Sequence, residues 1–115
     1  MLQKTASGIF YEIKEPGGSA KPVWGDKVLV HYVGRDLDLK VFDSSYLRKR
    51  PMEFYVGNVI PGWNEVLPML GEGGRGIFVI PAHLAYGDEG FGDLVSPGQH
   101  LIFDIQLLEV IKEKE

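Results

Sequence analysis

The sequence predicts an α+β domain in which one short helix covers a mainly antiparallel sheet, and two observations carry this prediction. Short apolar runs alternate with polar residues along the chain, and 15 glycines and 7 prolines are spread between the runs; this pattern is typical of half-buried strands joined by turns. A single segment spaces its apolar residues as a helix does. Five or six antiparallel strands and one helix are therefore expected.

The first half of the chain contains four predicted strands. Apolar residues alternate over residues 9–13 and again, more strongly, over residues 28–33. The second of these strands should return as a hairpin through residues 41–42. The turn between them, residues 36–39, lacks the glycine that tight hairpin turns prefer, so we expect a longer loop there. A further short strand is predicted over residues 54–56.

The helix is predicted over residues 62–70, where four apolar side chains recur at helical spacing. These side chains are Trp63, Val66, Leu67 and Leu70. Pro68 lies inside the segment, where its ring removes one backbone donor and clashes with the carbonyl four residues earlier. The helix should therefore be short or kinked.

A glycine-rich segment follows the helix and matches the GxGxxG pattern of dinucleotide sites, as residues 71–76 read Gly-Glu-Gly-Gly-Arg-Gly. Such a site must follow a strand and open a helix, so that the phosphate meets the helix N-terminus. Here the helix comes first and a predicted strand, residues 77–80, comes after. We therefore interpret the segment as a helix stop and turn, and reject a nucleotide site. A long loop over residues 81–99 and a last strand over residues 101–111 complete the chain.

Length and composition exclude several classes of protein. The 115 residues fit one domain spanning residues 1–115, of which we expect residues 1–8 to be loosely ordered, and the net charge of −4 gives no basis for nucleic-acid binding. The absence of cysteine excludes disulfides, thiolate catalysis and cysteine-based metal sites. No apolar run is long enough to span a bilayer, so no membrane partner is expected. The expected location is cytoplasmic for a complete chain, and periplasmic or surface-exposed for a domain cut from an exported protein.

Conventional catalytic residues are not recognisable in the sequence. The three histidines, His31, His83 and His100, have no second ligand at a spacing typical of metal sites. Neither a nucleophile elbow nor a carboxylate pair in recognisable context occurs. The basic run over residues 48–50 is interpreted as a solvated loop edge, apart from Arg48, which belongs to a motif given below.

Aromatic and aliphatic residues are unusually frequent in segments expected to be loops or strand ends. They are Tyr32, Phe42, Phe54, Val59, Ile60, Trp63, Tyr86, Phe91, Leu94, Val95 and Phe103. Core packing explains Phe54 and Phe103, which lie in alternating strands. It explains less well Trp63 beside a Pro-Gly pair, Tyr86 before a glycine, and residues 94–95 in a glycine-rich loop. An aromatic-lined ligand pocket is therefore predicted.

Four sequence blocks, in order along nearly the whole chain, resemble the motifs of the FKBP family of peptidyl-prolyl cis-trans isomerases. They are residues 30–34 and 42–45 with Arg48 and Pro51, residues 59–65, residues 80–81 with 84–87, and Pro97 with residues 101–108. The opening, which includes Gly8, Tyr11 and residues 25–26, is similar to bacterial members of the macrophage-infectivity-potentiator type. The resemblance implies a half-barrel of antiparallel strands wrapped around one short helix, with the pocket between them.

The resemblance also implies the roles of the catalytic residues. Trp63 would form the pocket floor beneath the bound proline ring. The hydroxyl of Tyr86 would donate a hydrogen bond to a substrate carbonyl. Asp43, buried near Tyr32 and Arg48, would be the polar group close to the twisting bond.

The substrate-binding residues that the resemblance implies form the walls and rim of the pocket. They are Tyr32, Phe42, Arg48, Met52, Phe54, Val59, Ile60, Phe91, Leu94, Val95 and Phe103. Ile60 would in addition donate its backbone N–H to a substrate carbonyl. Met52 stands where the family commonly has an aromatic residue, and Phe91 where it commonly has a polar one. We therefore expect a shifted preference for the residue before proline.

The implied activity is cis-trans isomerisation of X-Pro peptide bonds, which assists protein folding and needs no nucleophile, metal or cofactor. The barrier to rotation is about 18–20 kcal/mol and comes from amide resonance, which a twisted bond loses. Expected partners are proline-containing peptides or unfolded protein segments, and macrolides of the tacrolimus or rapamycin type; the chain is expected to be a monomer. The alternative is a non-catalytic proline-peptide binding or scaffold module with the same fold. The joint presence of Asp43, Trp63 and Tyr86 favours the enzyme.

Overall fold

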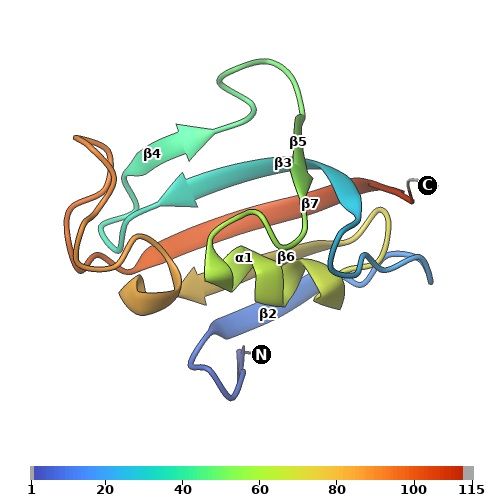
Figure 1. The fold of residues 1–115 in the computed structure, drawn as a ribbon, viewed down its shortest axis with the longest axis horizontal. Helices are drawn as coiled ribbons and strands as arrows, with labels where there is room; N and C mark the ends of the chain where they lie inside the picture. Colours follow the sequence, from blue (N-terminus) through green and yellow to red (C-terminus); the bar gives the residue numbers. More distant parts are fainter. Residues whose placement is uncertain (1, 113–115) are drawn as a thin grey trace.

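The computed structural model describes residues 2–112, and in this part of the chain seven antiparallel strands form one sheet against a short helix (Figure 1). The strands are β1 (Gln3–Lys4), β2 (Phe10–Glu15), β3 (Lys27–Arg35), β4 (Val41–Ser44), β5 (Met52–Tyr55), β6 (Arg75–Ile80) and β7 (Leu101–Ile111). The helical segments are α1 (Pro61–Val66) and the 3-10 turns Leu67–Met69 and Ala82–Leu84. The α+β fold class predicted from the sequence is confirmed, and the sheet has seven strands rather than five or six because β1 is added at its edge.

The sheet has the strand order β1-β2-β6-β7-β3-β4, and β5 pairs with β3 as well. The first half of β3 pairs with β5, from Lys27 opposite Tyr55 to Val30 opposite Met52. The end of β3 pairs with β4, where Val33 lies opposite Ser44. Strands β4 and β5 therefore share one edge of β3, and the chain between them must leave the sheet and return to it.

The hydrophobic core lies between α1 and the face of the sheet that the helix crosses (Figure 1). Alternate residues of β3 are buried, including Val28, Val30 and Tyr32, as the period of two in a strand requires. On the helix side, Val66 and Leu67 are fully buried. One curved sheet thus encloses one helix, as the resemblance implied.

Pro68 shortens the helix as expected. Helix α1 has six residues and begins with Pro61, whose missing N–H needs no partner in the first turn. The chain continues as the 3-10 turn Leu67–Met69, which contains Pro68. A proline in the interior of a longer α-helix would have left the carbonyl four residues earlier without its donor.

The glycine-rich segment after the helix is a turn that leads into β6, as predicted. Its glycines allow two turns to touch, since the Gly71 N–H donates to the Pro16 carbonyl and the Gly18 N–H to the Glu72 carbonyl, both at 2.9 Å. A β-carbon on Gly71 would overlap the Gly18 carbonyl oxygen. The glycines therefore serve backbone packing.

The N-terminal segment contains a short strand that was not predicted from the sequence. Gln3 and Lys4 form β1 and pair with Tyr11 and Phe10 of β2. The Thr5 N–H then donates to the Ile9 carbonyl at 2.9 Å. These are backbone interactions, and the exposed side chains of β1 carry no alternating pattern that could have predicted the strand.

The hairpin between β3 and β4 closes without glycine, although its connection is longer than two residues as predicted. The Asp36 N–H donates to the Lys40 carbonyl and the Leu39 N–H to the Asp36 carbonyl, each at 3.0 Å. Leu39 has a φ of 68°, in the left-handed region where a residue with a β-carbon is strained. The carboxylate of Asp36 accepts the Asp38 and Lys40 N–H groups and stabilises this turn.

Candidate functional site

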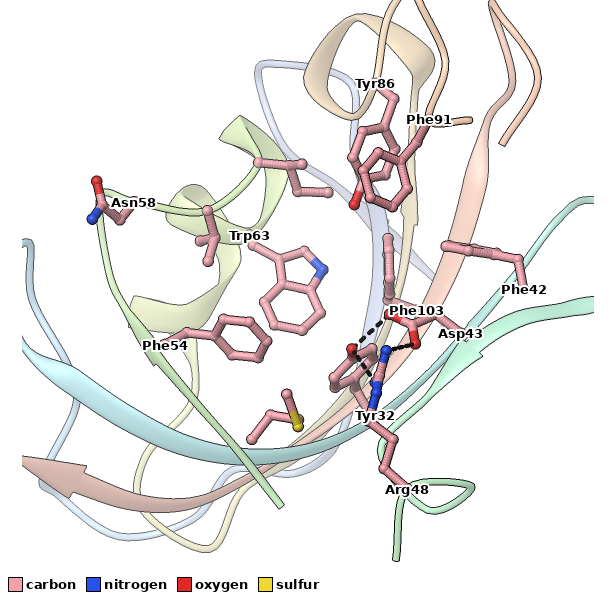
Figure 2. Close-up of a pocket in the computed structure, with 13 residues that line it drawn as sticks. Tyr32, Phe42, Asp43, Arg48, Phe54, Asn58, Trp63, Tyr86, Phe91 and Phe103 are labelled. Atoms are coloured by element: carbon pink, nitrogen blue, oxygen red, sulfur yellow. Dashed lines mark hydrogen bonds and ion pairs between the residues drawn. The ribbon is translucent and has the colours of Figure 1, made fainter. Parts of the chain in front are cut away.

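A cavity of about 410 Å³ opens between α1, strands β3 to β5 and the loop that follows β6 (Figure 2). Its walls are mostly aromatic and aliphatic. The lining residues are Tyr32, Phe42, Asp43, Arg48, Met52, Phe54, Asn58, Val59, Ile60, Trp63, Tyr86, Phe91 and Phe103. A concave apolar site with a few polar groups is the usual form of a small-ligand pocket.

Trp63 forms the floor of the cavity, and three rings hold its indole edge to face. The ring centroids of Tyr32, Phe54 and Phe103 lie 5.0, 5.2 and 5.3 Å from that of Trp63, at interplanar angles of 85°, 79° and 86°. Each T-shaped pair is worth about 0.5–1.5 kcal/mol beyond the buried area. Trp63 is only 4% exposed, and its Nε1–H finds no acceptor among residues 2–112. The floor is therefore rigid and retains one unused donor.

The segment before α1 forms one wall and is fixed by a single side chain. The Asn64 Oδ1 accepts the Gly57 N–H at 2.7 Å and the Val59 N–H at 3.4 Å, and the Asn64 Nδ2–H donates to the Val59 carbonyl at 3.0 Å. The Ile60 carbonyl accepts the Trp63 and Asn64 N–H groups at the helix start. Within the described part of the chain, no group accepts the Ile60 N–H. A second donor is thus free at the cavity wall.

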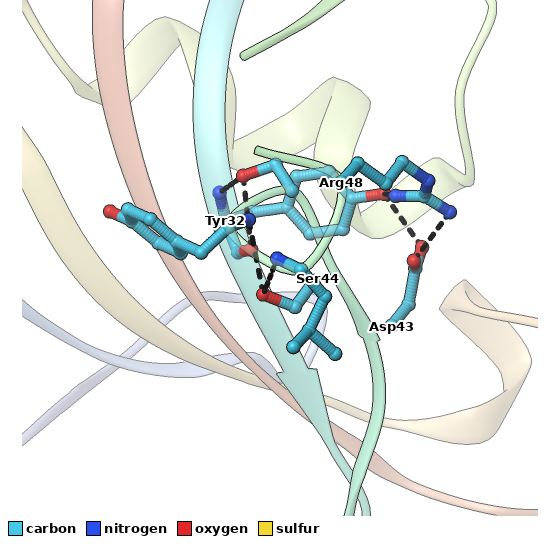
Figure 3. A network of polar contacts seen from close by, with 7 residues as sticks. Tyr32, Asp43, Ser44 and Arg48 are labelled. Carbon is cyan, nitrogen blue, oxygen red and sulfur yellow. Dashed lines mark hydrogen bonds and ion pairs between the residues drawn. The ribbon is translucent and has the colours of Figure 1, made fainter. Parts of the chain in front are cut away.

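A polar group of three side chains occupies the opposite corner of the cavity (Figures 2 and 3). The Tyr32 hydroxyl donates to Asp43 Oδ2 at 2.6 Å, and Arg48 Nη2 lies 2.6 Å from Asp43 Oδ1. The Arg48 Nη1–H donates to the Tyr32 hydroxyl oxygen at 3.1 Å. Both carboxylate oxygens are therefore held in place, Oδ2 by the Tyr32 hydroxyl and Oδ1 by the Arg48 guanidinium.

This arrangement also determines the protonation of Tyr32. Burial, with a further contribution from the hydrogen bond to Asp43, raises the pKa of Tyr32 to about 12, although the hydrogen bond from Arg48 opposes this rise. The hydroxyl is therefore a neutral donor at physiological pH. The contact with Tyr32, together with Asp43, raises the pKa of Arg48.

Arg48 reaches Asp43 because the segment between β4 and β5 is pinned where it leaves the sheet. Ser45 is fully buried, its N–H donates to the Tyr32 carbonyl at 3.0 Å, and its Oγ accepts the Tyr32 N–H at 2.8 Å. The Arg48 N–H then donates to the Ser45 carbonyl at 3.1 Å. Lys49 and Arg50 stay exposed, as predicted for this basic run. Figure 3 shows the guanidinium turned back towards Asp43.

Tyr86 closes the cavity from the loop that follows the 3-10 turn Ala82–Leu84. Its ring stacks on Phe91, with the centroids 5.0 Å apart and the planes at 19°. Burial raises the pKa of Tyr86, and the nearby charge of Asp43 adds to the rise, so the hydroxyl stays protonated at neutral pH. In the described residues nothing accepts or donates a hydrogen bond at this hydroxyl. It is the third free donor of the cavity.

The structure brings together all but two of the residues that the sequence predicted for the site. Leu94 and Val95 lie outside the cavity lining, because the backbone of Phe91 pairs with that of Val95 (Phe91 N–H to Val95 carbonyl, 2.8 Å) and closes the loop on itself. The Val95 side chain is then buried in the core at 1% exposure, and Leu94 is 54% exposed. Asn58 lines the cavity and was missed, since a polar residue after a strand signals only a turn.

Neither a metal site nor a membrane helix is formed by residues 2–112. No three side chains of the types His, Asp and Glu gather closely enough there to hold an ion. Nor does any helix in that range reach the length and apolar character needed to cross a bilayer.

Comparison with known proteins relates this geometry to a family. The family model described as FKBP-type peptidyl-prolyl cis-trans isomerase matches residues 18–108. The chain is 42% identical over 109 residues to the probable FKBP-type peptidyl-prolyl cis-trans isomerase FkpA of Neisseria meningitidis serogroup B, which is 95% of this chain and 40% of that protein. It is also 42% identical over 106 residues to the outer membrane protein MIP of Legionella longbeachae, which is 92% of this chain and 46% of that protein. The chain thus spans less than half the length of these two relatives.

A solved structure shows the same fold. The crystal structure of FkpA from Escherichia coli superposes with a TM-score of 0.92 at 39% sequence identity, and the match covers 96% of this chain and 51% of that one.

Proposed function

The chain belongs to the family of FKBP-type peptidyl-prolyl cis-trans isomerases, and on that basis we propose that it accelerates the rotation of X-Pro peptide bonds in the cavity above Trp63. One observation carries the proposal most directly. An apolar cavity holds three donors that find no acceptor among residues 2–112: the Trp63 Nε1–H, the Ile60 N–H and the Tyr86 hydroxyl. Proline brings an apolar ring and no N–H, and the peptide around it is rich in carbonyl acceptors.

The apolar part of the cavity binds the proline ring. The ring lies on the indole of Trp63, between the side chains of Tyr32, Phe54 and Phe103 that already hold this indole. Because the floor is rigid before the substrate arrives, little side-chain entropy is lost on binding. The nitrogen of the bound ring is one end of the X-Pro bond that must twist.

The free donors hold the peptide on either side of that bond. The Ile60 N–H and the Tyr86 hydroxyl donate to carbonyls of the substrate, which lost their hydrogen bonds to water on entering the cavity. Hydrogen bonds that form best at the twisted geometry bind the transition state more tightly than the planar ground state, and only such differential binding raises the rate.

Asp43 acts on the charge that the bond loses when it twists. Resonance places negative charge on the carbonyl oxygen of a planar amide, and twisting removes it. A carboxylate held beside that oxygen by Tyr32 and Arg48 disfavours the planar form more than the twisted one. The reaction requires no covalent step, so the site needs a fixed charge and an apolar wall that excludes water rather than a nucleophile.

The direct test is the cis-trans exchange of a tetrapeptide with leucine or phenylalanine before proline, measured by NMR with substoichiometric protein. The proposal requires faster exchange with the wild-type chain. Tyr86→Phe and Asp43→Val should each reduce kcat/KM by about tenfold, equivalent to roughly 1.4 kcal/mol of transition-state stabilisation. Saturable shift changes without faster exchange would replace the enzyme with a proline-peptide binding module.

The finer details of partners and location are proposals of the same kind. A macrolide of the tacrolimus or rapamycin type should occupy the cavity and inhibit exchange competitively, which a titration of the exchange rate would test. Residues 1–115 are proposed to act as one monomeric isomerase domain, a point for sedimentation analysis. Similarity to a relative named as an outer membrane protein supports an exported location, which fractionation of cells that make the full protein would decide.

A further inference from the structure

Trp24 lies in the turn before β3 and exposes 72% of its surface, whereas Trp63 exposes 4%. Its neighbour Val23 is 56% exposed as well. The proposed chemistry does not use either residue, and neither one lines the cavity. Large exposed aromatic side chains that are nonetheless well held are typical of binding surfaces.

The turn that carries Trp24 is held rigidly against the end of β5. The Val23 N–H donates to Asp26 Oδ2 at 2.8 Å, and the Asp26 N–H donates to the Val23 carbonyl at 3.0 Å. The Gly25 N–H donates to the Val56 carbonyl, and the Val56 N–H to the Asp26 carbonyl, both at 2.9 Å. The backbone on both sides of the indole is therefore fixed.

The indole itself rests on the backbone of Gly57. A β-carbon on Gly57 would lie 2.7 Å from Cε2 and 2.9 Å from Nε1 of Trp24, so only glycine leaves room for the ring. Gly57 also has a φ of 108°, which a residue with a β-carbon rarely adopts. The ring is thus seated on one side and open to solvent on the other.

The seat of Trp24 is continuous with the wall of the cavity. Gly57 is followed directly by Asn58, Val59 and Ile60, which all line the cavity. The Asn64 side chain ties Gly57 and Val59 together through the hydrogen bonds given above. Figure 2 shows Asn58 at the outer edge of the cavity, on the side away from Phe42 and Asp43. A peptide that leaves the cavity past Asn58 advances about 3.3–3.6 Å per residue and so meets the indole within a few residues.

We propose that Trp24 is an outer subsite that binds an apolar side chain, such as leucine, two to five residues away from the proline on the same substrate polypeptide. This inference rests on the proposed function, because the proline must occupy the cavity for the flanking chain to reach the indole. The occupant is the substrate itself, since the surface continues the cavity wall. The preferred substrate is then an extended, unfolded segment with apolar residues near its proline, and a tetrapeptide whose only leucine is next to the proline leaves the subsite empty.

The test compares peptides and variants in matched pairs. Each capped peptide contains a central Leu-Pro and one further leucine, placed in turn at each position from two to five residues from the proline on either side. The controls are the same peptides with serine in place of the further leucine, and a Leu-Pro tetrapeptide. The variants are Trp24→Gln and, as a control for the loss of an exposed apolar side chain elsewhere, Leu2→Gln, since Leu2 is 61% exposed.

The expected result is specific to one variant and one kind of peptide. At one or more leucine positions, Trp24→Gln should raise Kd by about three- to tenfold, as fits partial burial of a leucine on a single ring face. The serine peptides, the exchange rate of the tetrapeptide and the Leu2→Gln variant should be unchanged. In NMR spectra, the Trp24 indole N–H signal, identified by its loss in the variant, should shift with the leucine peptide and not with the tetrapeptide.

Two failures are distinguishable. Equal affinity of Trp24→Gln and the wild-type chain for every leucine peptide, or an equal loss for leucine and serine peptides, overturns the outer subsite. Wild-type protein that binds the peptides without accelerating exchange overturns the proposed function instead, and the leucine-to-serine comparison still decides the subsite. A chain that binds no proline peptide at all overturns both.

Discussion

Replacing Trp63 with alanine should cost this protein more than any change at the polar corner. The side chain is 4% exposed and touches three rings edge to face. Truncation of a buried tryptophan to alanine lowers the free energy of unfolding by about 3–5 kcal/mol, because the rings around it lose their partner and collapse only in part. Trp63→Ala should show most of this loss, because the three rings belong to three different strands and the sheet keeps them from closing the space that the indole leaves.

Arg48→Ala is the matched comparison at the same cavity. The Arg48 side chain is 43% exposed, and ion pairs at this exposure contribute about 1 kcal/mol or less. Asp43 keeps its hydrogen bond from Tyr32 in this variant. Stability should therefore fall by no more than about 1 kcal/mol. The fall in kcat/KM should stay below about fivefold, against about 10- to 100-fold for Trp63→Ala, which removes an apolar contact worth about 1.5–3 kcal/mol.

Urea unfolding followed by circular dichroism measures the two stabilities, and NMR exchange of an X-Pro tetrapeptide measures the two rates. The variant Trp63→Phe distinguishes the loss of core packing from the loss of the surface that binds the proline ring, since it keeps an aromatic ring in the same place. Equal losses in Trp63→Ala and Arg48→Ala, in stability and in kcat/KM alike, would refute both the placement of the proline ring on the indole and the packing argument.

Three further outcomes are expected. The pKa of Tyr32 rises from 10 in the unfolded chain to about 12 in the folded one, so the stability that this residue contributes is complete below pH 10 and is lost as the pH rises from 10 to 12. In urea unfolding over this range, the free energy of unfolding should therefore fall less steeply with pH in Tyr32→Phe than in the wild-type chain. An equal slope in both would contradict the assignment. Leu39→Asn should raise the free energy of unfolding by about 0.5–1 kcal/mol, because asparagine tolerates the left-handed backbone of the hairpin turn better; a loss in stability would mean that the Leu39 side chain packs. Gly71→Ala should lower the free energy of unfolding by about 2 kcal/mol or more, because the new β-carbon would overlap the Gly18 carbonyl. A Tm equal to that of the wild-type chain would show that the turns containing Gly18 and Gly71 can separate.

The elements that repeat a pattern over many residues could be predicted from the sequence. Strand β7 has the predicted bounds, Leu101–Ile111, because it alternates apolar and polar residues over its length. The short helix was predicted from its apolar spacing and from Pro68. Strand β5 spans Met52–Tyr55 rather than residues 54–56, because its bounds depend on the pairing with β3 and not on its own side chains.

Residue patterns indicated most of the apolar cavity lining, and the family resemblance added Asp43, Arg48 and Met52. Periodicity marks a side chain as buried, but it does not distinguish packing in the core from exposure to a cavity. Val95 illustrates this limit, since it was predicted to line the pocket and is buried in the core instead.

The fold class, the family and the order of every strand except β1 could be inferred from the sequence. The pairing of groups from distant segments appears only in the folded chain: Arg48 returns to Asp43, three donors around one apolar cavity find no acceptor within residues 2–112, and the Trp24 ring rests on Gly57. The physical reason is the range of the interactions. Alternation and helix spacing repeat within a few residues of one segment, whereas these contacts join segments whose separation in the chain carries no signal until the sheet brings them together.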